Sequence, residues 1–400
     1  MSEWKKIKLG DLITIKHGYA FDGEHISQDD NGKVLVTPGN FQIGGGFQEN
    51  KCKFFTGDIP EDYILKANDL IVTMTDLSKT IDTLGYSALI PYSEKRIYLH
   101  NQRIGLVKIK NADCNKKYLY YAMQTNEYQK SVAGTSSGAT VHHTSPSKIY
   151  DVSINLPPLS VQQKIADTLS AYDDLIENNR KQIKLLEEAA QKLYKEWFVK
   201  LNFPGHENTK IVDDIPDGWK KGVLSDISNI LMGQSPKSEF YNTEHKGLPF
   251  HQGVGSYGNR FVEDEVYSTD FTRIAEAGSI LFSVRAPVGR LNITKNKIVI
   301  GRGLSAMNQK EGYQSFLFYM LKEKFFKDDI IGNGSIFASI SKNELLSQSI
   351  IIPTTELMKK FDNIVSVYDK KLNVIDNQIN KLKAARNKLL PRLMNGNLEV

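Results

Sequence analysis

The stretch Ala166–Phe198, ADTLSAYDDLIENNRKQIKLLEEAAQKLYKEWF, decides the fold because its apolar residues recur at alternating spacings of three and four. Over four heptads, such a seam favours a coiled coil over a surface helix. A second stretch, residues 365–393, has a seam in the same register. The seam positions are Leu169, Tyr172, Ile176, Asn179, Ile183, Leu186, Ala190, Leu193 and Trp197, and then Val365, Tyr368, Leu372, Ile375, Ile379, Leu382, Arg386, Leu389 and Leu393.

Each seam contains one polar misfit, Asn179 in the first and Arg386 in the second. A polar residue at such a position specifies register at a cost in stability. A helix of about 38 residues is roughly 55 Å long at about 1.5 Å per residue. We therefore expect two long antiparallel coiled-coil helices that act as spacers. The alternative is two unrelated amphipathic helices, each packed on its own domain, but the shared register argues against it.

The shared register reflects an internal duplication of about 200 residues. A shift of 196 residues places Pro157 on Pro353 and the pair Tyr172-Asp173 on Tyr368-Asp369. The same shift matches Gly138 and Ser145 to Gly334 and Ser341, and a shift of 215 matches Trp4, Leu9, Asp11, Ile15 and Gly18 to Trp219, Leu224, Asp226, Ile230 and Gly233. Repeats of this kind have to be recognised before any fold is assigned.

The remainder of each copy contains short apolar and β-branched runs that end in Gly, Asp or Pro, which predicts strands of a mixed domain. The fold class is therefore α+β, with two mixed α/β domains and two spacer helices related by a pseudo-twofold duplication. The expected division is a first domain over residues 1–156, a first spacer helix over 157–200, a linker and second domain over 201–352, and a second spacer helix over 353–400.

Composition sets outer limits on function. A chain of 400 residues with 40% apolar content suggests at least two cores, and two cysteines cannot build a disulfide framework. No apolar run resembles a signal peptide or a membrane span, so we expect a cytoplasmic protein. The net charge of +5 is too small to establish or exclude a nucleic-acid partner.

The segment NLPPL, residues 155–159, invites comparison with the Asn-Pro-Pro-aromatic loop of amino-methyltransferases. Leu156 separates Asn155 from the prolines, and Leu159 stands where the aromatic residue belongs. The second copy has IIIPTTEL at this place, and no glycine-rich loop suited to S-adenosylmethionine precedes either segment. Proline is well suited to the entry of a helix, so the segment is better explained as the start of the first spacer.

Other catalytic and metal patterns are equally weak. Pro216-Asp217 with Glu244-His245-Lys246 can be forced into a nuclease pattern, but Pro-Asp-Gly is better explained as a turn. His142 and His143 lack further ligands at metal-binding spacing, and the chain has no phosphate-binding Gly-x₄-Gly-Lys-Ser/Thr loop. We therefore expect neither a catalytic site nor a bound metal or cofactor in this chain.

Several polar loops favour contacts with DNA. One loop rich in Gly, Ser and Thr precedes the last strand of each copy, GTSSGATVHHTSPSK in the first and GNGSIFASISK in the second. Small hydroxylic side chains and backbone amides are suited to contacts with phosphate. Arg pairs with guanine, and Asn or Gln with adenine, in the major groove. The candidate DNA-binding residues are His100, Asn101, Gln102, Arg103, Ser136, Thr140, His142, His143, Lys148, Gln234, Lys237, His251, Gln252, Asn259, Arg260, Arg285, Arg290, Arg302, Ser335 and Lys342.

The block GTSSGATVHHTSPSKIYDVSINLPPLSVQQKIADTLSAYDDLIENNRKQIKLLEEAAQKLYKEWF resembles the block of type I restriction–modification specificity (S) subunits that joins a recognition domain to its spacer helix. DIPDGWKKGVLSDI and the C-terminal ARNKLLPRLMNGNLEV are similar to other segments of that family, and the likeness covers the whole chain. Two departures are Val161-Gln162, where the family usually has Glu-Gln, and PTTELMKKF in the second copy.

The resemblance implies a non-catalytic subunit whose two domains each recognise half of a split, asymmetric site in double-stranded DNA. Its helices would set the spacing between the half-sites. Two methyltransferase subunits would bind S-adenosylmethionine and methylate adenines, and a motor–nuclease subunit is a further partner that the family allows. A protein scaffold with two domains that bind other proteins is the main alternative, because the helices suit it equally well.

Overall fold

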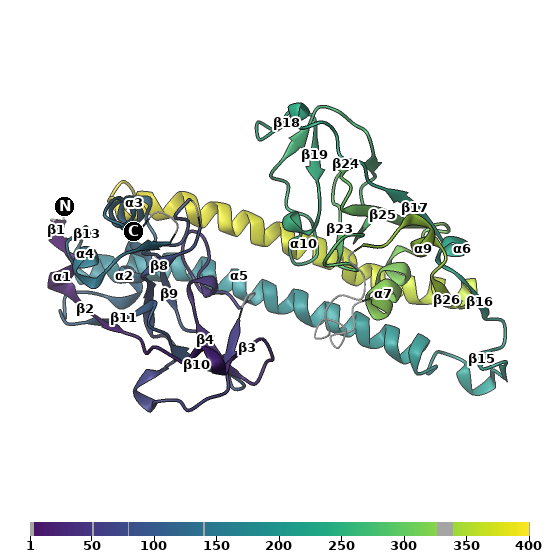
Figure 1. Ribbon diagram of the computed structural model, residues 1–400, viewed down its shortest axis with the longest axis horizontal. Coiled ribbons are helices and arrows are strands. Elements are labelled where there is room, and N and C mark those ends of the chain that lie inside the picture. Colours follow the sequence, from purple (N-terminus) through teal and green to yellow (C-terminus); the bar gives the residue numbers. More distant parts are fainter. Residues whose placement is uncertain (1–3, 50–51, 79, 139–140, 326–338, 400) are drawn as a thin grey trace. The chain divides into compact units, whose positions relative to one another are not determined.

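The computed structural model describes residues 4–49, 52–78, 80–138, 141–325 and 339–399. The chain divides into two compact units (Figure 1). The first unit consists of residues 1–178 and 378–400, and the second of residues 179–377. Each unit therefore contains one globular part together with a portion of both long helices.

The two long helices are the predicted spacers. Helix α5 comprises Leu159–Tyr194 and continues into a π-helical turn at Lys195–Val199. Helix α10 comprises Thr355–Met394. Each begins two residues after its predicted start, directly past Pro157-Pro158 and Pro353-Thr354. The role predicted for these prolines, as the entry to a helix, is confirmed.

The first unit has two main sheets. One has the strand order β3 (Ile26–Ser27), β5 (Lys53–Phe55), β4 (Lys33–Val36), β10 (Ile97–His100) and β6 (Ile64–Leu65). The other has the order β2 (Ile13–His17), β11 (Ile104–Ile109), β7 (Leu70–Thr73) and β9 (Ser87–Leu89). Strands β4 and β10 are parallel, whereas the other pairs in these two sheets are antiparallel.

The second unit repeats both orders strand for strand. Its larger sheet is β18 (Tyr241–Asn242), β20 (Tyr267–Ser268), β19 (Leu248–His251), β24 (Ile298–Ile300) and β21 (Ile274–Ala275). Its smaller sheet is β17 (Ser228–Met232), β25 (Leu304–Gln309), β22 (Ile280–Ser283) and β23 (Leu291–Ile293). The parallel pair is again the equivalent one, β19 with β24. The predicted duplication is thus confirmed at the level of topology.

Smaller elements complete each unit. A two-stranded sheet joins the beginning of each copy to its end, as β1 (Lys5–Lys8) with β13 (Ser153–Leu156) and β16 (Lys220–Val223) with β26 (Ser349–Ile352). The equivalent helices of the two units are α1 (Leu9–Leu12) and α6 (Leu224–Ile227), α2 (Lys116–Ala122) and α7 (Gln314–Phe325), and α4 (Pro146–Tyr150) and α9 (Lys342–Leu346). Helix α3 (Asn126–Gly134) also belongs to the first unit, and the hairpin β14 (Ile211–Val212) with β15 (Ile215–Pro216) to the second.

Within each unit the two helix portions run antiparallel and share the core of the globular part. In the first unit, Ile165 and Leu169 of α5 share a cluster with Leu393 of α10. In the second unit, Tyr194 of α5 packs on Phe361 of α10, with ring centroids 5.8 Å apart. Burying the apolar seam against both a second helix and the domain core stabilises helices of this length.

The two copies join the spacer helix to a helix of the globular part through different side chains and different backbone groups. At the start of α5, the buried Gln162 accepts a hydrogen bond from Asn115 N at 2.8 Å and donates to Pro157 O at 2.7 Å. In the second copy, Asp362 of α10 accepts instead from Ser315 N at 2.9 Å, within the first turn of α7. A carboxylate suits this place because the first amides of a helix lack partners inside the helix. The drift in the second copy therefore leaves the contact between spacer and domain intact.

The seam misfit Arg386 also has a structural partner. Its guanidinium donates to Asp173 Oδ1 at 2.5 Å, and Asp173 Oδ2 accepts from the hydroxyl of Tyr121 at 2.7 Å. This network joins α10, α5 and α2 within the first unit. No helix among the residues that the structure describes is long and apolar enough to cross a membrane.

Candidate nucleic-acid interface

In both units a tight turn follows the second strand of the parallel pair, which is β10 in the first unit and β24 in the second. In the first unit, Ile104 N donates to Asn101 O at 2.9 Å, which closes the turn between β10 and β11. In the second unit, Leu304 N donates to Gly301 O at 3.0 Å between β24 and β25. The central residues of these turns are exposed or partly exposed: Gln102 and Arg103 in the first unit, and Arg302 and Gly303 in the second. We call these two segments, residues 101–104 and 301–304, the paired turns.

A glycine lets a second chain segment pass close to each of the paired turns. A Cβ on Gly18 would lie 2.1 Å from Asn101 O, and a Cβ on Gly233 would lie 2.2 Å from Gly301 O. Only a residue without a side chain fits at such distances. These two glycines are the pair that the 215-residue shift superposes, so the duplication preserves the close approach.

The second unit gathers four polar side chains at and around its turn, those of Gln234, Ser235, Gln252 and Arg302. Ser235 Oγ donates to Gln252 Oε1 at 2.7 Å and accepts from Arg302 N at 3.2 Å. Gln252 and Arg302 are exposed, and Gln234, whose amide donates to Ile300 O at 3.0 Å, is exposed as well. The second unit therefore presents one guanidinium and two carboxamides on adjacent loops.

The two hydroxyl-rich loops contain a pair of equivalent helix caps that was not predicted. Ser145 caps α4 by accepting from Lys148 N at 3.4 Å, and Ser341 caps α9 by accepting from Glu344 N at 3.3 Å. The 196-residue shift had matched these two serines. Their side chains satisfy helix amides, as serine commonly does at this position.

The adjacent histidines pair with a strand whose buried carboxylate organises the loop that follows it. His142 and His143 form strand β12, which pairs with β8 (Thr75–Asp76). Asp76 is only 2% exposed and accepts from the backbone amides of Ser78, Thr83 and Leu84. Burial by itself would raise the pKa of Asp76, but the hydrogen bonds from Ser78 and Thr83 outweigh it and hold the pKa below its ordinary value.

Replacing Asp76 with asparagine is expected to reduce the free energy of unfolding by about 2–3 kcal/mol, because charge-assisted hydrogen bonds to buried amides are lost. The folded-state pKa lies below the ordinary value of 3.8, so the stabilisation is complete above about pH 4 and declines as the pH falls further. Urea unfolding between pH 3 and 7 measures it, with the exposed Asp58→Asn as a control. Equal losses in the two variants at pH 7 would refute this role.

The predicted contact residues are exposed or partly exposed, buried, or outside the described residues. Exposed or partly exposed on the first unit are Asn101, Gln102, Arg103, Ser136, His142, His143 and Lys148. Exposed or partly exposed on the second unit are Gln234, Lys237, Gln252, Asn259, Arg285, Arg290, Arg302 and Lys342. Thr140 and Ser335 lie outside the described residues. For the exposed residues, contact with DNA stays a prediction.

Three predicted contact residues, His100, His251 and Arg260, are buried rather than exposed, because the fold supplies their polar groups with internal partners. His100 Nε2 donates to Ile104 O at 2.8 Å inside the turn, and burial lowers the pKa of the imidazole. His251 is bonded to Ser256 Oγ at 2.7 Å and to Asp264 Oδ1 at 2.9 Å. Polar side chains that leave water in this way need such partners.

Arg260 is 2% exposed and belongs to an internal charge network. Its guanidinium contacts Glu187 of α5, with Nη1 and Oε1 3.1 Å apart, and Asp369 of α10. The same group lies 4.3 Å from the ring centroid of Phe318. This arginine therefore ties a loop of the globular part to both helix portions of the second unit.

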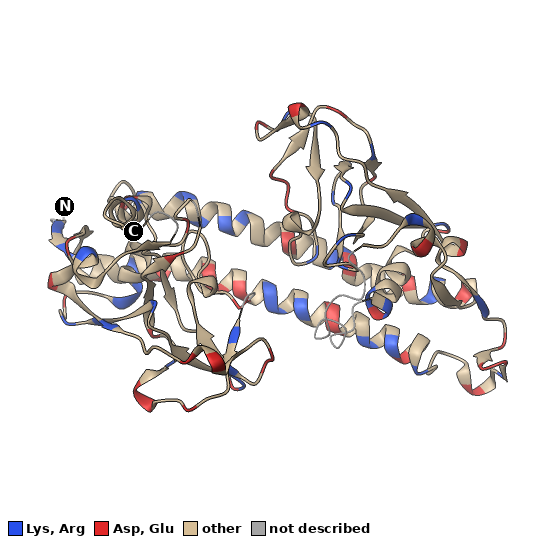
Figure 2. Cartoon of the chain, in the orientation of Figure 1, with Lys and Arg blue, Asp and Glu red and all other residues tan. Residues whose placement is uncertain are grey.

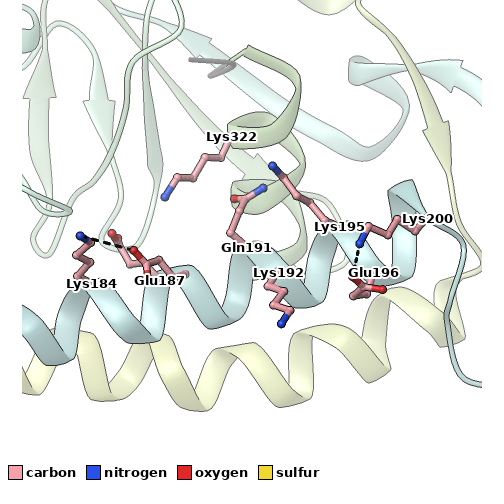
Figure 3. Close-up of a pocket in the computed structure, with 9 residues that line it drawn as sticks. Lys184, Glu187, Gln191, Lys192, Lys195, Glu196, Lys200 and Lys322 are labelled. Atoms are coloured by element: carbon pink, nitrogen blue, oxygen red, sulfur yellow. Dashed lines mark hydrogen bonds and ion pairs between the residues drawn. The ribbon is translucent and has the colours of Figure 1, made fainter. Parts of the chain in front are cut away.

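A charged cleft of about 700 Å³ lies between α5 and α7 in the second unit (Figure 3). It is lined by Lys184, Glu187, Glu188, Gln191, Lys192, Lys195, Glu196, Lys200 and Lys322. Ligand pockets for small molecules are mostly apolar with a few polar groups. A lining composed almost entirely of lysine and glutamate does not have that character.

Basic and acidic residues both occur along α5 and along α10 as far as Asp376, whereas the charged residues in the rest of α10 are all basic (Figure 2). Across the part of the chain that the structure describes, no group of three or more His, Cys, Asp or Glu side chains is arranged to hold a metal ion. The groups with candidate function are thus the exposed polar side chains at the paired turns and their neighbouring loops.

One neighbour of the turn in the first unit was missed by sequence analysis. Tyr19 directly follows Gly18, is 41% exposed, and packs on Tyr63 with ring centroids 5.2 Å apart. Its carbonyl accepts from Gln102 N at 2.9 Å. The sequence could have identified Tyr19, because the 215-residue shift places it on Gln234, which is a candidate DNA-binding residue.

Comparisons with known proteins agree on one family. The type I restriction modification DNA specificity domain matches residues 1–188 and 216–384. A putative type I restriction enzyme MjaX specificity subunit of Methanocaldococcus jannaschii is 31% identical over 310 residues, which cover 76% of this chain and 72% of that protein. The MjaVIII specificity subunit of the same organism is 24% identical over 423 residues, covering 100% and 93%.

The fold is shared with a solved structure of the same kind. A type I restriction–modification system S subunit from M. genitalium has a TM-score of 0.56 and 17% identity, and the match covers 98% of this chain and 96% of that one. The family match extends over both copies of the duplication and most of the chain. This chain belongs to the family of type I restriction–modification DNA specificity subunits, the DNA-recognition rather than the catalytic components of these systems.

Proposed function

We propose that each unit of this chain recognises one half of a split, asymmetric DNA site, and that the long helices set the distance between the halves. The observation that carries this proposal is the pair of equivalent turns with different exposed side chains. The two units have the same sheet topology, and Gln102 and Arg302 occupy matching positions in it. The units therefore offer different hydrogen-bonding groups at the same place. Two recognition units with different side chains, held at a fixed distance by the long helices, are suited to a DNA site whose two halves differ in sequence.

The proposal assigns methylation to partner subunits. Two methyltransferase subunits would bind S-adenosylmethionine and modify adenines in double-stranded DNA, and a motor–nuclease subunit would add restriction. An exposed apolar stripe on α10 of the second unit supports docking of such a partner. Ile364, Val367 and Val374 are 40%, 60% and 55% exposed at spacings of three and seven residues, and thus share a helix face.

The test is a genome-wide map of methylated adenines in cells that express this chain with its methyltransferase partner. We expect a bipartite asymmetric motif that is absent when the methyltransferase is expressed alone. Binding of S-adenosylmethionine to the partner shows that its cofactor site is intact. No new methylation from a soluble, assembled complex would contradict the proposal.

A protein scaffold is the competing function, and salt dependence separates the two. Lysine and arginine contacts to phosphates release counterions, so the affinity of the complex for DNA should fall steeply as the salt concentration rises. A duplex that contains the mapped motif and one with both half-sites scrambled, measured at several salt concentrations, give this comparison. Equal affinity for the two duplexes would favour the scaffold.

A further inference from the structure

We infer that the paired turns determine base identity, with Arg302 directed to a guanine in the second half-site and Gln102 directed to an adenine in the first. This inference rests on the proposed function and specifies the chemistry of its site. Arg is the commonest partner of guanine O6 and N7, and Gln is suited to adenine N6 and N7. No other pair of exposed candidates lies at equivalent positions of the turns in the described residues.

The equivalence of the two positions follows from strand pairing rather than from sequence likeness. His100 is paired with Val36 at the end of β10, and Ile300 is paired with His251 at the end of β24. Gln102 and Arg302 are each the second residue after these strand ends. Each follows the residue whose carbonyl accepts the closing hydrogen bond of its turn. The two side chains therefore leave the same point on the same scaffold.

The turn in the second unit is held in place by Gln252. A Cβ on Gly301 would lie 2.6 Å from Gln252 Oε1, and a Cβ on Gly303 would lie 2.5 Å from Gln252 O. The glycines thus allow this side chain and its backbone to pack directly against the turn. Ser235 completes the support by bonding both Gln252 Oε1 and Arg302 N. A rigid base for a long side chain reduces the entropy lost when it binds.

Arg302 differs from Arg260 in the exposure of its guanidinium, and this difference allows Arg302 to contact a base. The Arg260 guanidinium is buried and engaged by Glu187 and Asp369, whereas Arg302 is exposed at the tip of a turn. Only an exposed guanidinium can present its two parallel N–H groups to a base edge.

The surroundings of the turn in the first unit favour an A·T pair. Tyr19 lies beside Gln102 and is partly exposed, with its ring supported by Tyr63. Because the Tyr19 carbonyl accepts from Gln102 N, an exposed ring belongs to the residue that is backbone-bonded to Gln102, and such a ring can contact the methyl group of a thymine while the carboxamide bonds to adenine. In the second unit Gln234 stands at the position of Tyr19, so this apolar surface is replaced by a polar one.

The experiment exchanges the two residues in the full complex. Methylated-adenine maps are recorded for the wild type, Arg302→Gln and Gln102→Arg, each assembled with the methyltransferase partner. We expect Arg302→Gln to lose about ten- to hundredfold of its preference for guanine at one position of the second half-site. The first half-site should be unchanged. Gln102→Arg should alter one position of the first half-site alone, so each variant is the control for the other.

A phosphate contact is the outcome that would overturn the inference. In that case Arg302→Gln would weaken binding to all duplexes alike and reduce the salt dependence, with an unaltered motif. Arg302→Lys distinguishes a phosphate contact from a base contact, because a lysine retains the phosphate contact but not the bidentate geometry that a guanine requires. The adenine map of the wild type distinguishes a failure of the proposed function from a failure of the base assignment. A wild type without a bipartite motif refutes the proposed function, whereas a normal wild-type motif that survives both exchanges refutes only the assignment of bases.

Discussion

Replacing Arg260 with methionine is expected to destabilise the second unit by about 3–5 kcal/mol, the usual cost of removing one partner from a buried ion pair. The variant leaves Glu187 and Asp369 near one another without their shared cation. It also removes the hydrogen bond from Nη1 to the hydroxyl of Tyr319, at 3.3 Å, and the contact with the Phe318 ring. Methionine can fill the volume but can satisfy neither carboxylate.

The loss should depend on pH in a defined direction. Burial raises the pKa of Asp369, and Arg260 opposes that shift in the wild type. Without the arginine the folded-state pKa rises further, so the Asp369 carboxyl can bind a proton at mildly acidic pH. A group whose pKa is raised on folding favours the folded state at low pH and loses that effect as the pH rises. The destabilisation by Arg260→Met should therefore be smaller at pH 5 than at pH 8.

Hydrogen exchange and denaturant unfolding measure this effect unit by unit. Amides of β19, β24 and α7 in the second unit should lose protection, while β4, β10 and α2 in the first unit keep theirs. Arg285→Met is a matched control because Arg285 is exposed, and it should change stability by no more than about 0.5 kcal/mol. A loss below about 1 kcal/mol for Arg260→Met would show that the network is not a main support of the unit.

Inserting one heptad into each long helix is expected to lengthen the spacing between the half-sites while leaving both half-sites unchanged. The insertions belong between Asn178 and Asn179 in α5 and between Asn377 and Gln378 in α10, where the chain passes from one unit to the other. Seven residues add about 10 Å of helix, which corresponds to at most about three base pairs. A whole heptad preserves the seam, so the helices can still pair.

The adenine map of the insertion variant measures the new spacing. Seven-residue glycine–serine inserts at the same two places are the control, since they add chain length without a helical seam. They should abolish a defined spacing or reduce methylation strongly. A heptad variant whose motif keeps the original spacing would refute the role of the helices as a ruler, and altered half-site bases would refute the modular recognition.

The duplication and the long helices were predictable because both are periodic. A seam at spacings of three and four specifies a helix regardless of what surrounds it, and α5 and α10 accordingly begin within two residues of their predicted starts. The 196- and 215-residue shifts required two copies of one topology, and the sheets have the same strand order. The 215-residue shift also matches Gly18 to Gly233, and both glycines closely approach the paired turns.

Burial and pairing of the polar residues were decided only by the tertiary structure. The sequence by itself determined that Arg260 is a guanidinium in a polar loop, which is equally suited to DNA and to an internal ion pair. Its partners Glu187 and Asp369 lie 73 and 109 residues away, and no local pattern relates them. Strand hydrogen bonds and helix packing bring these residues together. A charged side chain has the same chemistry in either setting, but only the surrounding fold determines whether water, DNA or a carboxylate meets it.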